Sequence, residues 1–328
     1  MPNLRVLSAA DLEHLVSMQD AIQALREAFL ALAQTRARVP LRVHLPTPSG
    51  DALWMPALVE GVGLGLKAVT VFPGNPQRGL PTIQAAVLLL DPTDGRPLGL
   101  VEGASLTALR TGAVTGLATD LLARRDAAVA AIFGCGVQAR RQLEGVCAVR
   151  SVTQVRVYCP TPAHRESFAA WARGRPWLAG ASVFSAPSPQ AAVRGADVVV
   201  TATPSREPVF DPADVTSGAH VNAIGAYTPQ MREVPAEVVR RARVVVDSLE
   251  AARAEAGDLI QAAAEGAFDW SHAVELGQLI EDPSLGRRGP DEVTLFKSVG
   301  VAIQDVAVGM LALRRAAEQG AGAEVPWT

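Results

Sequence analysis

Hydrophobic positions recur with a helical spacing near the start of the chain and with a strand-like pattern from about residue 38. After Met18, the residues Ile22, Leu25, Phe29 and Leu32 recur three or four positions apart, which predicts a helix with one face in the core. Beyond it, apolar runs separated by Pro, Gly and Asp clusters predict strands at 39–45, 53–59, 64–72, 83–90 and 98–102. A strong turn signal at 91–95 indicates a mainly antiparallel sheet.

The chain after residue 127 alternates between short apolar runs and helical patterns. Strands are expected at 127–133, 153–158, 181–184, 197–202, 219–224 and 243–247, with helices at 137–148, 162–173 and 188–194. Such alternation predicts a parallel sheet wound on both faces by helices. An Ala- and Leu-rich helix over about 106–123 precedes this region, and an apolar helix over about 293–317 is expected to pack back on the first part of the chain.

The length supports two domains in an α/β protein. A single hydrophobic core stops growing at roughly 250 to 300 residues, and this chain has 328. We expect a discontinuous α+β domain over 1–120 and 300–328, built from both chain ends, and a doubly wound parallel-sheet domain over 121–299.

Composition and charge narrow the function classes. The net charge is −3 and the arginines are scattered, so nucleic acid is not an expected partner. There is no apolar run of about 18 residues and no signal-peptide layout, so we expect a cytoplasmic protein without membrane contact. The three cysteines are expected to be core residues, and the five histidines show no metal-binding spacing, so no metal site is predicted.

Lysine is scarce: only Lys67 and Lys297 occur among 30 basic residues. Arginine stays charged in any protein setting, whereas a lysine in a dry pocket shifts its pKa readily and can transfer a proton. Lys67 lies in an apolar, strand-like run and is the first catalytic candidate, the alternative being a charge that merely survives on a strand surface. Lys297 is expected to be solvated at the start of an amphipathic helix.

A glycine-rich loop follows the apolar run at 127–133 and precedes a helix. Its residues Gly134-Cys135-Gly136-Val137-Gln138-Ala139 fit the G-x-G-x-x-A pattern of a dinucleotide-binding turn. Gly134 would permit the tight turn, Gly136 would let the backbone approach a pyrophosphate, and Ala139 would allow close helix packing. The alternative is a glycine-rich turn without a ligand.

The next strand ends in Tyr158-Cys159-Pro160, without the acidic residue that would bind a ribose 2′-hydroxyl. Thr161, His164 and Arg165 follow directly and could receive a 2′-phosphate. We therefore expect NADP(H) as the preferred cofactor, with NAD(H) possible, although these residues could also be an exposed helix start.

Arg42, Lys67 and Arg110 together offer three cations upstream of the nucleotide loop. Each charge-assisted hydrogen bond from such a group to a carboxylate contributes roughly 1.5–3 kcal/mol, and the planar arginine fork sets the orientation. The expected substrate is therefore a carboxylic acid. Any one of these arginines taken alone, Arg42 in particular, is more often a surface charge.

The sequence resembles the ornithine cyclodeaminase and mu-crystallin family over nearly its whole length. The resemblance is carried by the following segments: Gly65-Leu66-Lys67, Phe72-Pro73-Gly74-Asn75-Pro76, Gly79-Leu80-Pro81-Thr82, Leu106-Thr107-Ala108-Leu109-Arg110-Thr111, Gly134 to Arg140, Thr201-Ala202-Thr203-Pro204, Asn222-Ala223-Ile224-Gly225-Ala226 and Ser298-Val299-Gly300. It implies a Rossmann domain inserted into a substrate and dimerisation domain, and hence a homodimer.

The resemblance also implies roles for individual residues. Arg42, Lys67 and Arg110 would hold the substrate carboxylate, and Thr82 would line the pocket. The cofactor would be held by Thr111, Gly134, Gly136, Val137, Gln138, Ala139, Thr161, Arg165, Thr201, Ala202, Thr203, Ile224, Gly225, Ser298 and Gly300.

One position departs from the family pattern. Cyclodeaminases resemble one another in placing an aspartate at the position where this chain has Tyr227. The phenol of Tyr227 would hydrogen-bond an imine or shape the pocket. The leading hypothesis is therefore an NAD(P)H-dependent reductase of an α-imino acid, with Lys67, Arg110 and Tyr227 as catalytic candidates. Alternatives are an NAD-dependent ornithine cyclodeaminase, in which Glu102 could replace the aspartate, an alanine-dehydrogenase-like enzyme, and a non-catalytic nucleotide-binding protein.

Overall fold

The computed structural model describes residues 3–327. By its internal contacts the chain forms two compact units, a first that runs up to Arg110 and resumes at Val301, and a second over Thr111–Gly300. The first boundary falls inside a continuous helix, α3 (Gly103–Leu122). Within the described chain, no helix is both long and apolar enough to span a bilayer.

The first unit contains an eight-stranded sheet that is mainly antiparallel, as the sequence predicts. Its strand order is β16-β1-β7-β6-β5-β4-β2, with β3 also paired to β4, and only β1 and β7 run parallel. The expected hairpin joins β6 to β7, where Gly95 has φ +77° and Asp91 N–H donates to the Arg96 carbonyl. The strands are β1 (Asn3–Leu7), β2 (Ala37–Arg38), β3 (Val43–Thr47), β4 (Gly50–Val59), β5 (Gly63–Val71), β6 (Ile83–Leu90), β7 (Pro97–Glu102) and β16 (Ala323–Pro326).

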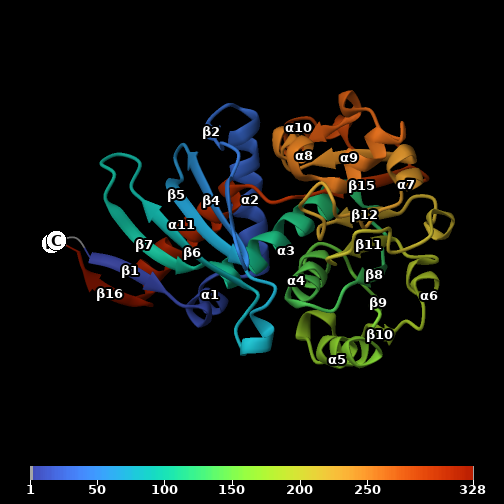
Figure 1. Cartoon of the computed structure of the whole chain (residues 1–328), viewed down its shortest axis with the longest axis horizontal. Coiled ribbons are helices and arrows are strands. Elements are labelled where there is room, and N and C mark those ends of the chain that lie inside the picture. Colours follow the sequence, from blue (N-terminus) through green and yellow to red (C-terminus); the bar gives the residue numbers. More distant parts are fainter. Residues whose placement is uncertain (1–2, 328) are drawn as a thin grey trace. The chain divides into compact units, whose positions relative to one another are not determined.

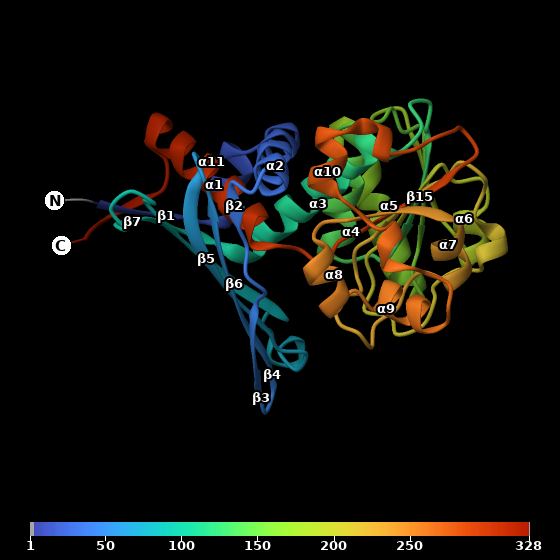
Figure 2. The same cartoon turned by 90° about the horizontal axis from the view of Figure 1, so that it is seen from above.

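Helices α1 (Ala9–Leu15), α2 (Met18–Ala33) and α11 (Ala302–Gln319) complete this unit. Ser8 and Ser17 cap α1 and α2 through reciprocal capping boxes. Helix α11 packs on α2 and on β4, β5 and β6, as expected for the last helix. A side chain at Gly65 would collide with Val306 of α11, so a glycine there permits the close approach. Figure 2 shows β3 and β4 reaching beyond the helices of this unit.

The other face of this sheet presents a row of apolar side chains. Pro56, Leu66, Leu88 and Leu100 face one another across β4, β5, β6 and β7, and Val6 of β1 pairs with Leu100. All five are partly exposed, whereas the chain neighbours of Pro56, Leu66, Leu88 and Leu100 are buried. This alternation is the period-two pattern of a two-faced sheet.

The second unit is the predicted doubly wound sheet. Its eight strands follow the order β10-β9-β8-β11-β12-β15-β13-β14, and every pairing is parallel. The order reverses direction at β8, which creates the switch point typical of nucleotide-binding folds. The strands are β8 (Val129–Phe133), β9 (Gln154–Tyr158), β10 (Ser182–Ser185), β11 (Val198–Thr201), β12 (His220–Ala223), β13 (Ala242–Val246), β14 (Val274–Glu275) and β15 (Val293–Lys297).

Helices cover both faces of this sheet, with α4 and α5 on one face and α6 and α7 on the other (Figure 1). The helices are α4 (Val137–Cys147), α5 (Pro162–Arg173), α6 (Pro189–Val193), α7 (Ala236–Arg241), α8 (Leu249–Glu255), α9 (Gly257–Ala264) and α10 (Leu276–Glu281). Single 3-10 turns lie at Pro76–Arg78, Pro176–Leu178, Pro212–Asp214, Trp270–His272 and Pro283–Leu285. Helices α7 to α10 are additions to the sequence prediction.

The expected helix over 293–317 is wrong in its first part. Residues Val293–Lys297 form β15, a fully buried strand between β12 and β13. The chain then turns at Gly300, whose φ is +80°, before α11 begins at Ala302. A run of five buried residues satisfies its backbone in the parallel sheet, and this tertiary environment overrides the helical pattern.

Candidate functional site

The three cations that the sequence singles out lie close together in the first unit. Lys67 on β5 pairs with Met55 on β4, whose neighbour Trp54 pairs with Val43 on β3. Arg42 directly precedes Val43, so it lies level with Lys67 across the sheet. The charges of both Arg110 and Arg42 lower the pKa of Lys67. The structure therefore joins residues from three separate segments into one cluster.

Asp305 of α11 is the carboxylate that pairs with this cluster, and the sequence analysis missed it. Its Oδ2 lies 2.9 Å from Lys67 Nζ, and its Oδ1 accepts a hydrogen bond from Arg110 Nε at 3.2 Å. Gln304 accepts a further hydrogen bond from Arg110 Nη1. Lys67, Arg110 and Asp305 are 2%, 5% and 1% exposed. The sequence did offer a clue to this carboxylate, because Gln304 and Asp305 are adjacent polar residues inside an otherwise apolar helical pattern. We call Arg42, Lys67, Arg110 and Asp305 the cation cluster.

The pKa of Lys67 is lowered to about 7. Burial is the largest cause because it disfavours the charged form, and the Arg110 charge adds to it. The charge of Asp305 and its hydrogen bond raise the pKa of Lys67 and so partly offset the effects of burial and of Arg110. At neutral pH both forms of Lys67 are populated, so Nζ can either donate or accept a proton.

Thr82 and Glu102 occupy other positions on this sheet. Thr82 is next to Ile83, which pairs with Val71, whereas Lys67 pairs with Val87. The β5–β6 register thus separates Thr82 from Lys67 along the strands, and its place in a substrate pocket stays a prediction. Glu102 accepts hydrogen bonds from the backbone N–H groups of Ala104 and Ser105, both at 2.8 Å. Its carboxylate therefore serves the start of α3.

In the second unit, the loop from β8 to α4 has the geometry expected of a phosphate-binding turn. Gly134 has φ +111°, and a Cβ there would lie 2.5 Å from the Ala202 carbonyl, so only glycine fits. A Cβ at Gly136 would meet nothing within 4 Å. Gly136 is also the N-cap of α4 and has no side chain to cap its first N–H groups. Ala139 is fully buried. The open space at this helix start fits a pyrophosphate.

The loop opens on a pocket of about 530 Å³. The residues around it come from the ends of β8, β9 and β11 and from the first turns of α4 and α5. They are Gly134, Cys135, Gly136, Arg140, Cys159, Pro160, Thr161, His164, Ser167, Ala202, Thr203 and Pro204. This Gly134 pocket brings Gly134 and Gly136, two of the five predicted loop residues, together with Thr161, Ala202 and Thr203. Val137, by contrast, is 68% exposed, and Gln138 accepts a hydrogen bond from Gln142.

Two arginines lie near this pocket, and the cofactor contact expected of Arg165 stays a prediction. Arg165 donates to the Cys159 carbonyl at 2.8 Å, and its guanidinium lies over the Tyr158 ring. It supports the end of β9 and is not one of the residues that line the pocket. Arg140, which was not proposed as a site residue, does line the pocket, and its guanidinium lies 5.0 Å from the centre of the Trp171 ring. The sequence could have suggested Arg140 as a pocket residue, because it directly follows Ala139 of the glycine-rich loop.

Thr111 begins the second unit within α3 and is 7% exposed. The next residue, Gly112, lies against the backbone of Arg141 in α4, and Gly145 of α4 lies against the Gly112 carbonyl. Side chains at either glycine would collide with the facing backbone. This glycine contact seats α4 against α3 and thereby positions the helix start at the Gly134 pocket.

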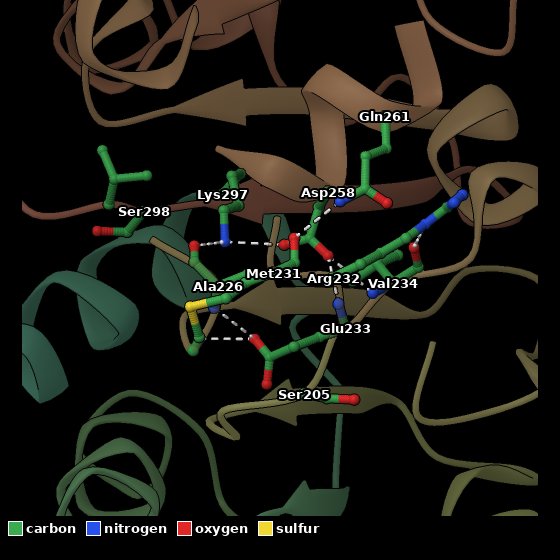
Figure 3. Close-up of polar contacts among 12 residues, drawn as sticks. Ser205, Ala226, Met231, Arg232, Glu233, Val234, Asp258, Gln261, Lys297 and Ser298 are labelled. Carbon is green, nitrogen blue, oxygen red and sulfur yellow. Dashed lines mark hydrogen bonds and ion pairs between the residues drawn. The ribbon is translucent and has the colours of Figure 1, made fainter. Parts of the chain in front are cut away.

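Glu233 joins the segments that follow β11 and β12, and Figure 3 shows its side chain reaching Ala226. Its Oε1 accepts from the backbone N–H and hydroxyl of Thr203, at 2.6 and 2.8 Å. Its Oε2 accepts from Gly225 N–H at 2.6 Å and Ala226 N–H at 3.1 Å. Thr201, at the end of β11, accepts from Ile224 N–H through its carbonyl. One carboxylate therefore fixes two loops that the sequence analysis assigned to the cofactor.

Lys297 is fully buried, which corrects the expectation that it is solvated. Its Nζ lies 2.8 Å from Asp258 Oδ2 and donates to the Ala226 carbonyl. Asp258 in turn accepts from the backbone N–H groups of Glu233 and Val234 at 2.6 and 2.9 Å (Figure 3). Burial, followed by the charge of Asp258, raises the pKa of Glu233. Lys297 needs an ammonium because it balances buried carboxylates in this network.

Tyr227 and Ser298 lie on loops held by buried carboxylates. Tyr227 follows Ala226 and is 37% exposed. Ser298 donates its hydroxyl to Asp247 Oδ2 at 2.7 Å, and Gly300 N–H donates to the same oxygen at 2.7 Å. Asp247 thus shapes the turn between β15 and α11, and direct cofactor contacts of Ser298 and Gly300 stay predictions. Within residues 3–327, no cluster of three or more His, Cys, Asp or Glu side chains is placed to hold a metal ion.

Comparison with known proteins finds a matching family and several similar proteins. The sequence profile of the ornithine cyclodeaminase/mu-crystallin family matches residues 3–320. A Δ1-pyrroline-2-carboxylate reductase of Bacillus cereus is 40% identical over 326 residues, covering 98% of this chain and 99% of the relative. The Δ1-pyrroline-2-carboxylate reductase of Thermococcus litoralis, solved with NADH and L-proline, matches with a TM-score of 0.94 and 40% identity, covering 98% and 100% of the two chains. An archaeal alanine dehydrogenase dimer with bound NAD matches with a TM-score of 0.92 and 36% identity, covering 99% and 100%.

Proposed function

Because this chain belongs to the ornithine cyclodeaminase/mu-crystallin family, we propose that it is an NAD(P)H-dependent reductase that converts an α-imino acid into an amino acid. The reaction adds a hydride to the carbon of a C=N bond and a proton to its nitrogen. The proposed substrate is a cyclic imine or ketimine that carries a carboxylate. Δ1-Pyrroline-2-carboxylate, named in two similar proteins, is the first compound to test.

The observation that carries this proposal is the cation cluster. Arg42, Lys67 and Arg110 gather three basic side chains around Asp305. Such a cluster suits a substrate carboxylate, and Arg110, whose Nε is held by Asp305, presents its guanidinium in a defined orientation. Arg42 and Arg110 would bind the carboxylate and leave Lys67 for the nitrogen.

Lys67 is the proposed proton donor. Its pKa of about 7 keeps a useful fraction of ammonium at neutral pH while making loss of the proton easy. Nζ would give its proton to the imine nitrogen as the C=N bond is reduced and would regain one from solvent. When bound, a reduced nicotinamide supplies the hydride. Asp305 would hold Nζ in place throughout.

The Gly134 pocket is the proposed dinucleotide site. Gly134, Gly136 and the first N–H groups of α4 would hold the pyrophosphate, since that helix start is open and has no side-chain cap. We further assign Thr111, Thr201, Ala202, Thr203, Ile224, Gly225, Ser298 and Gly300 to the cofactor side, and Thr82 and Tyr227 to the substrate side.

NADP(H) is the proposed preference for this chain, although two similar structures contain NADH or NAD. No acidic residue ends β9, so nothing there repels a 2′-phosphate. Thr161, His164 and Arg140 all line the pocket on that side and offer hydrogen-bond donors.

A homodimer is proposed from the apolar row on the first sheet. Pro56, Leu66, Leu88 and Leu100 form a partly exposed stripe across four strands, and such contiguous apolar surface marks an interaction site. Light scattering after gel filtration should give a dimer, and Leu88→Glu should give a monomer. A monomeric wild type would refute this assignment.

We also place the protein in the cytoplasm, since its three free cysteines suit a reducing compartment.

The test of the function is a spectrophotometric assay of NADPH and NADH oxidation. The panel contains Δ1-pyrroline-2-carboxylate, a six-membered cyclic imino acid, and pyruvate with ammonia or methylamine. Stoichiometric oxidation with the cyclic imines, and formation of L-proline from the first, would support the proposal. Turnover only with pyruvate and ammonia would indicate an alanine-dehydrogenase-like enzyme. No oxidation with any compound would refute a reductase.

A further inference from the structure

Cys135 and Cys159 lie side by side in the Gly134 pocket. Cys135 is the middle residue of the glycine-rich loop, and Cys159 directly follows β9. Their sulfur atoms are 2.8 Å apart, and Cys135 donates its S–H to Cys159. A disulfide needs about 2.05 Å between the sulfurs, so a small side-chain adjustment would suffice. The third cysteine, Cys147, is in α4 and does not line the pocket.

The backbone around this pair is already suited to a cross-link. Strands β8 and β9 are neighbours, with Phe133 paired to Tyr158 immediately before the two cysteines. Gly134 N–H donates to the Tyr158 carbonyl at 2.9 Å, which holds the two chain segments together. Both cysteines are partly exposed, so small molecules that enter the pocket can reach them.

We propose that Cys135 and Cys159 are a redox modification site, at which a low-molecular-weight disulfide forms an intramolecular disulfide that weakens dinucleotide binding. The inference rests on the proposed function, because it requires that the Gly134 pocket bind a nucleotide. The Gly134 pocket would then react with small disulfides in addition to binding the cofactor.

The chemistry balances as a two-electron exchange. The Cys159 thiolate attacks one sulfur of the small disulfide, which releases one small thiolate and leaves a mixed disulfide on Cys159. Cys135 then loses its proton and attacks the Cys159 sulfur, which releases the second small thiol. The two protein thiols are oxidised and the small disulfide is reduced. Burial, followed by the hydrogen bond to Cys159, raises the pKa of Cys135, so the first attack falls to Cys159.

The cross-link would join two parts of the pocket that must both adapt to the ligand. Cys135 belongs to the turn that would hold the pyrophosphate, and Cys159 ends the strand that would face the ribose. A covalent bond between them fixes the loop in one arrangement. By linkage, if the disulfide weakens nucleotide binding by some factor, bound nucleotide must disfavour the disulfide by the same factor. Nucleotide should therefore protect the thiols.

The experiment compares reduced full-length protein with the same protein treated with oxidised glutathione, a small disulfide that accepts two electrons from a pair of thiols. Intact mass should fall by two hydrogen atoms in wild type and in Cys147→Ser, the matched control, but not in Cys135→Ser or Cys159→Ser. The dissociation constant for NADPH, measured by cofactor fluorescence, should rise about tenfold in the two proteins that cross-link. Dithiothreitol should reverse both changes, and saturating NADPH should slow the loss of hydrogen.

The outcomes separate this inference from the proposed function. Reduced protein that binds neither NADPH nor NADH would refute the proposed function and the inference together. Reduced protein that binds NADPH but forms no Cys135–Cys159 disulfide would refute the inference alone. The inference alone is also refuted if the disulfide forms and the NADPH dissociation constant is unchanged, or if Cys159→Ser responds to oxidised glutathione as the wild type does.

Discussion

Lys67 Nζ and Asp305 Oδ2 form an ion pair of 2.9 Å in which both side chains are at least 98% buried. The lysine comes from β5 and the aspartate from α11, near opposite ends of the chain. Since Asp305 opposes the effects of burial and of Arg110 on the Lys67 pKa, it sets the pH range in which Lys67 keeps its proton. The first prediction follows from this relationship.

Asp305→Asn should move the alkaline limb of the pH–rate profile to lower pH. Reduction needs the Lys67 ammonium, so activity falls as pH rises through a pKa of about 7 in the wild type. Loss of the opposite charge lowers that pKa by at least about one unit. Initial rates across pH with saturating NADPH measure the shift. Asp126→Asn makes the same change at a side chain that is 80% exposed and should leave the profile unchanged. An unshifted limb in Asp305→Asn would contradict the assigned role.

Lys67→Arg should keep the fold and nucleotide binding but lose most turnover. The charge remains, yet a guanidinium does not give up its proton near neutral pH and is bulkier than an ammonium. NADPH titration and imine-dependent oxidation should be measured on the same preparation. A rate close to that of the wild type would remove Lys67 from proton transfer.

Lys67 should also make folding stability depend on pH. Its pKa is about 7 when folded and 10.5 when unfolded, so between these values the unfolded chain binds more protons. Stability therefore rises with pH in this window, by up to about 1.4 kcal/mol per unit for this one group. Lys67→Met removes this contribution. Urea unfolding of both proteins should be measured below pH 7 and at two higher pH values. The free energy of unfolding of the wild type should rise with pH relative to that of the variant. Equal changes of this free energy with pH in the two proteins would refute the lowered pKa of Lys67.

NADPH should bind more tightly than NADH, because no carboxylate at the end of β9 repels the 2′-phosphate. Thr161→Asp places a negative charge on a pocket-lining residue three positions after β9 and should reverse the preference. Thr153→Asp adds the same charge just before the start of β9 and serves as the control. Fluorescence titration with both nucleotides measures the ratio. A wild type that prefers NADH would show that another feature recognises the ribose.

Ornithine cyclodeaminase activity should be low or absent. Cyclisation requires an unprotonated δ-amine, and the residue expected to assist it is Tyr227, a phenol that stays neutral near pH 7 and accepts protons poorly. Glu102, the other candidate, uses its carboxylate to hold the start of α3. Proline and ammonia should be assayed from ornithine with catalytic NAD, in wild type and Tyr227→Asp. Robust proline formation by the wild type would restore the cyclodeaminase reading.

The two sheets and the glycine-rich loop were predictable because each depends on local pattern. Period-two runs around a turn signal predicted the antiparallel sheet. The strand–loop–helix order correctly placed Gly134 and Gly136 between the carboxyl end of β8 and the start of α4. The scarcity of lysine also singled out Lys67 as a catalytic candidate. Both lysines are buried, at 2% and 0% exposure, although only Lys67 was expected to be.

What the sequence alone determined is therefore most of the helices and strands, the family, and the residue types available for chemistry. The tertiary structure decided which charges meet: Asp305 with Lys67 and Arg110, and Asp258 with Lys297. An acidic residue in a helix pattern reads as solvent-facing until the partner that cancels its charge is known. That partner comes from a distant segment, and periodicity within one segment carries no information about contacts between segments. Burial and pairing, which set the pKa values on which the proposed chemistry depends, could be found only in the folded chain.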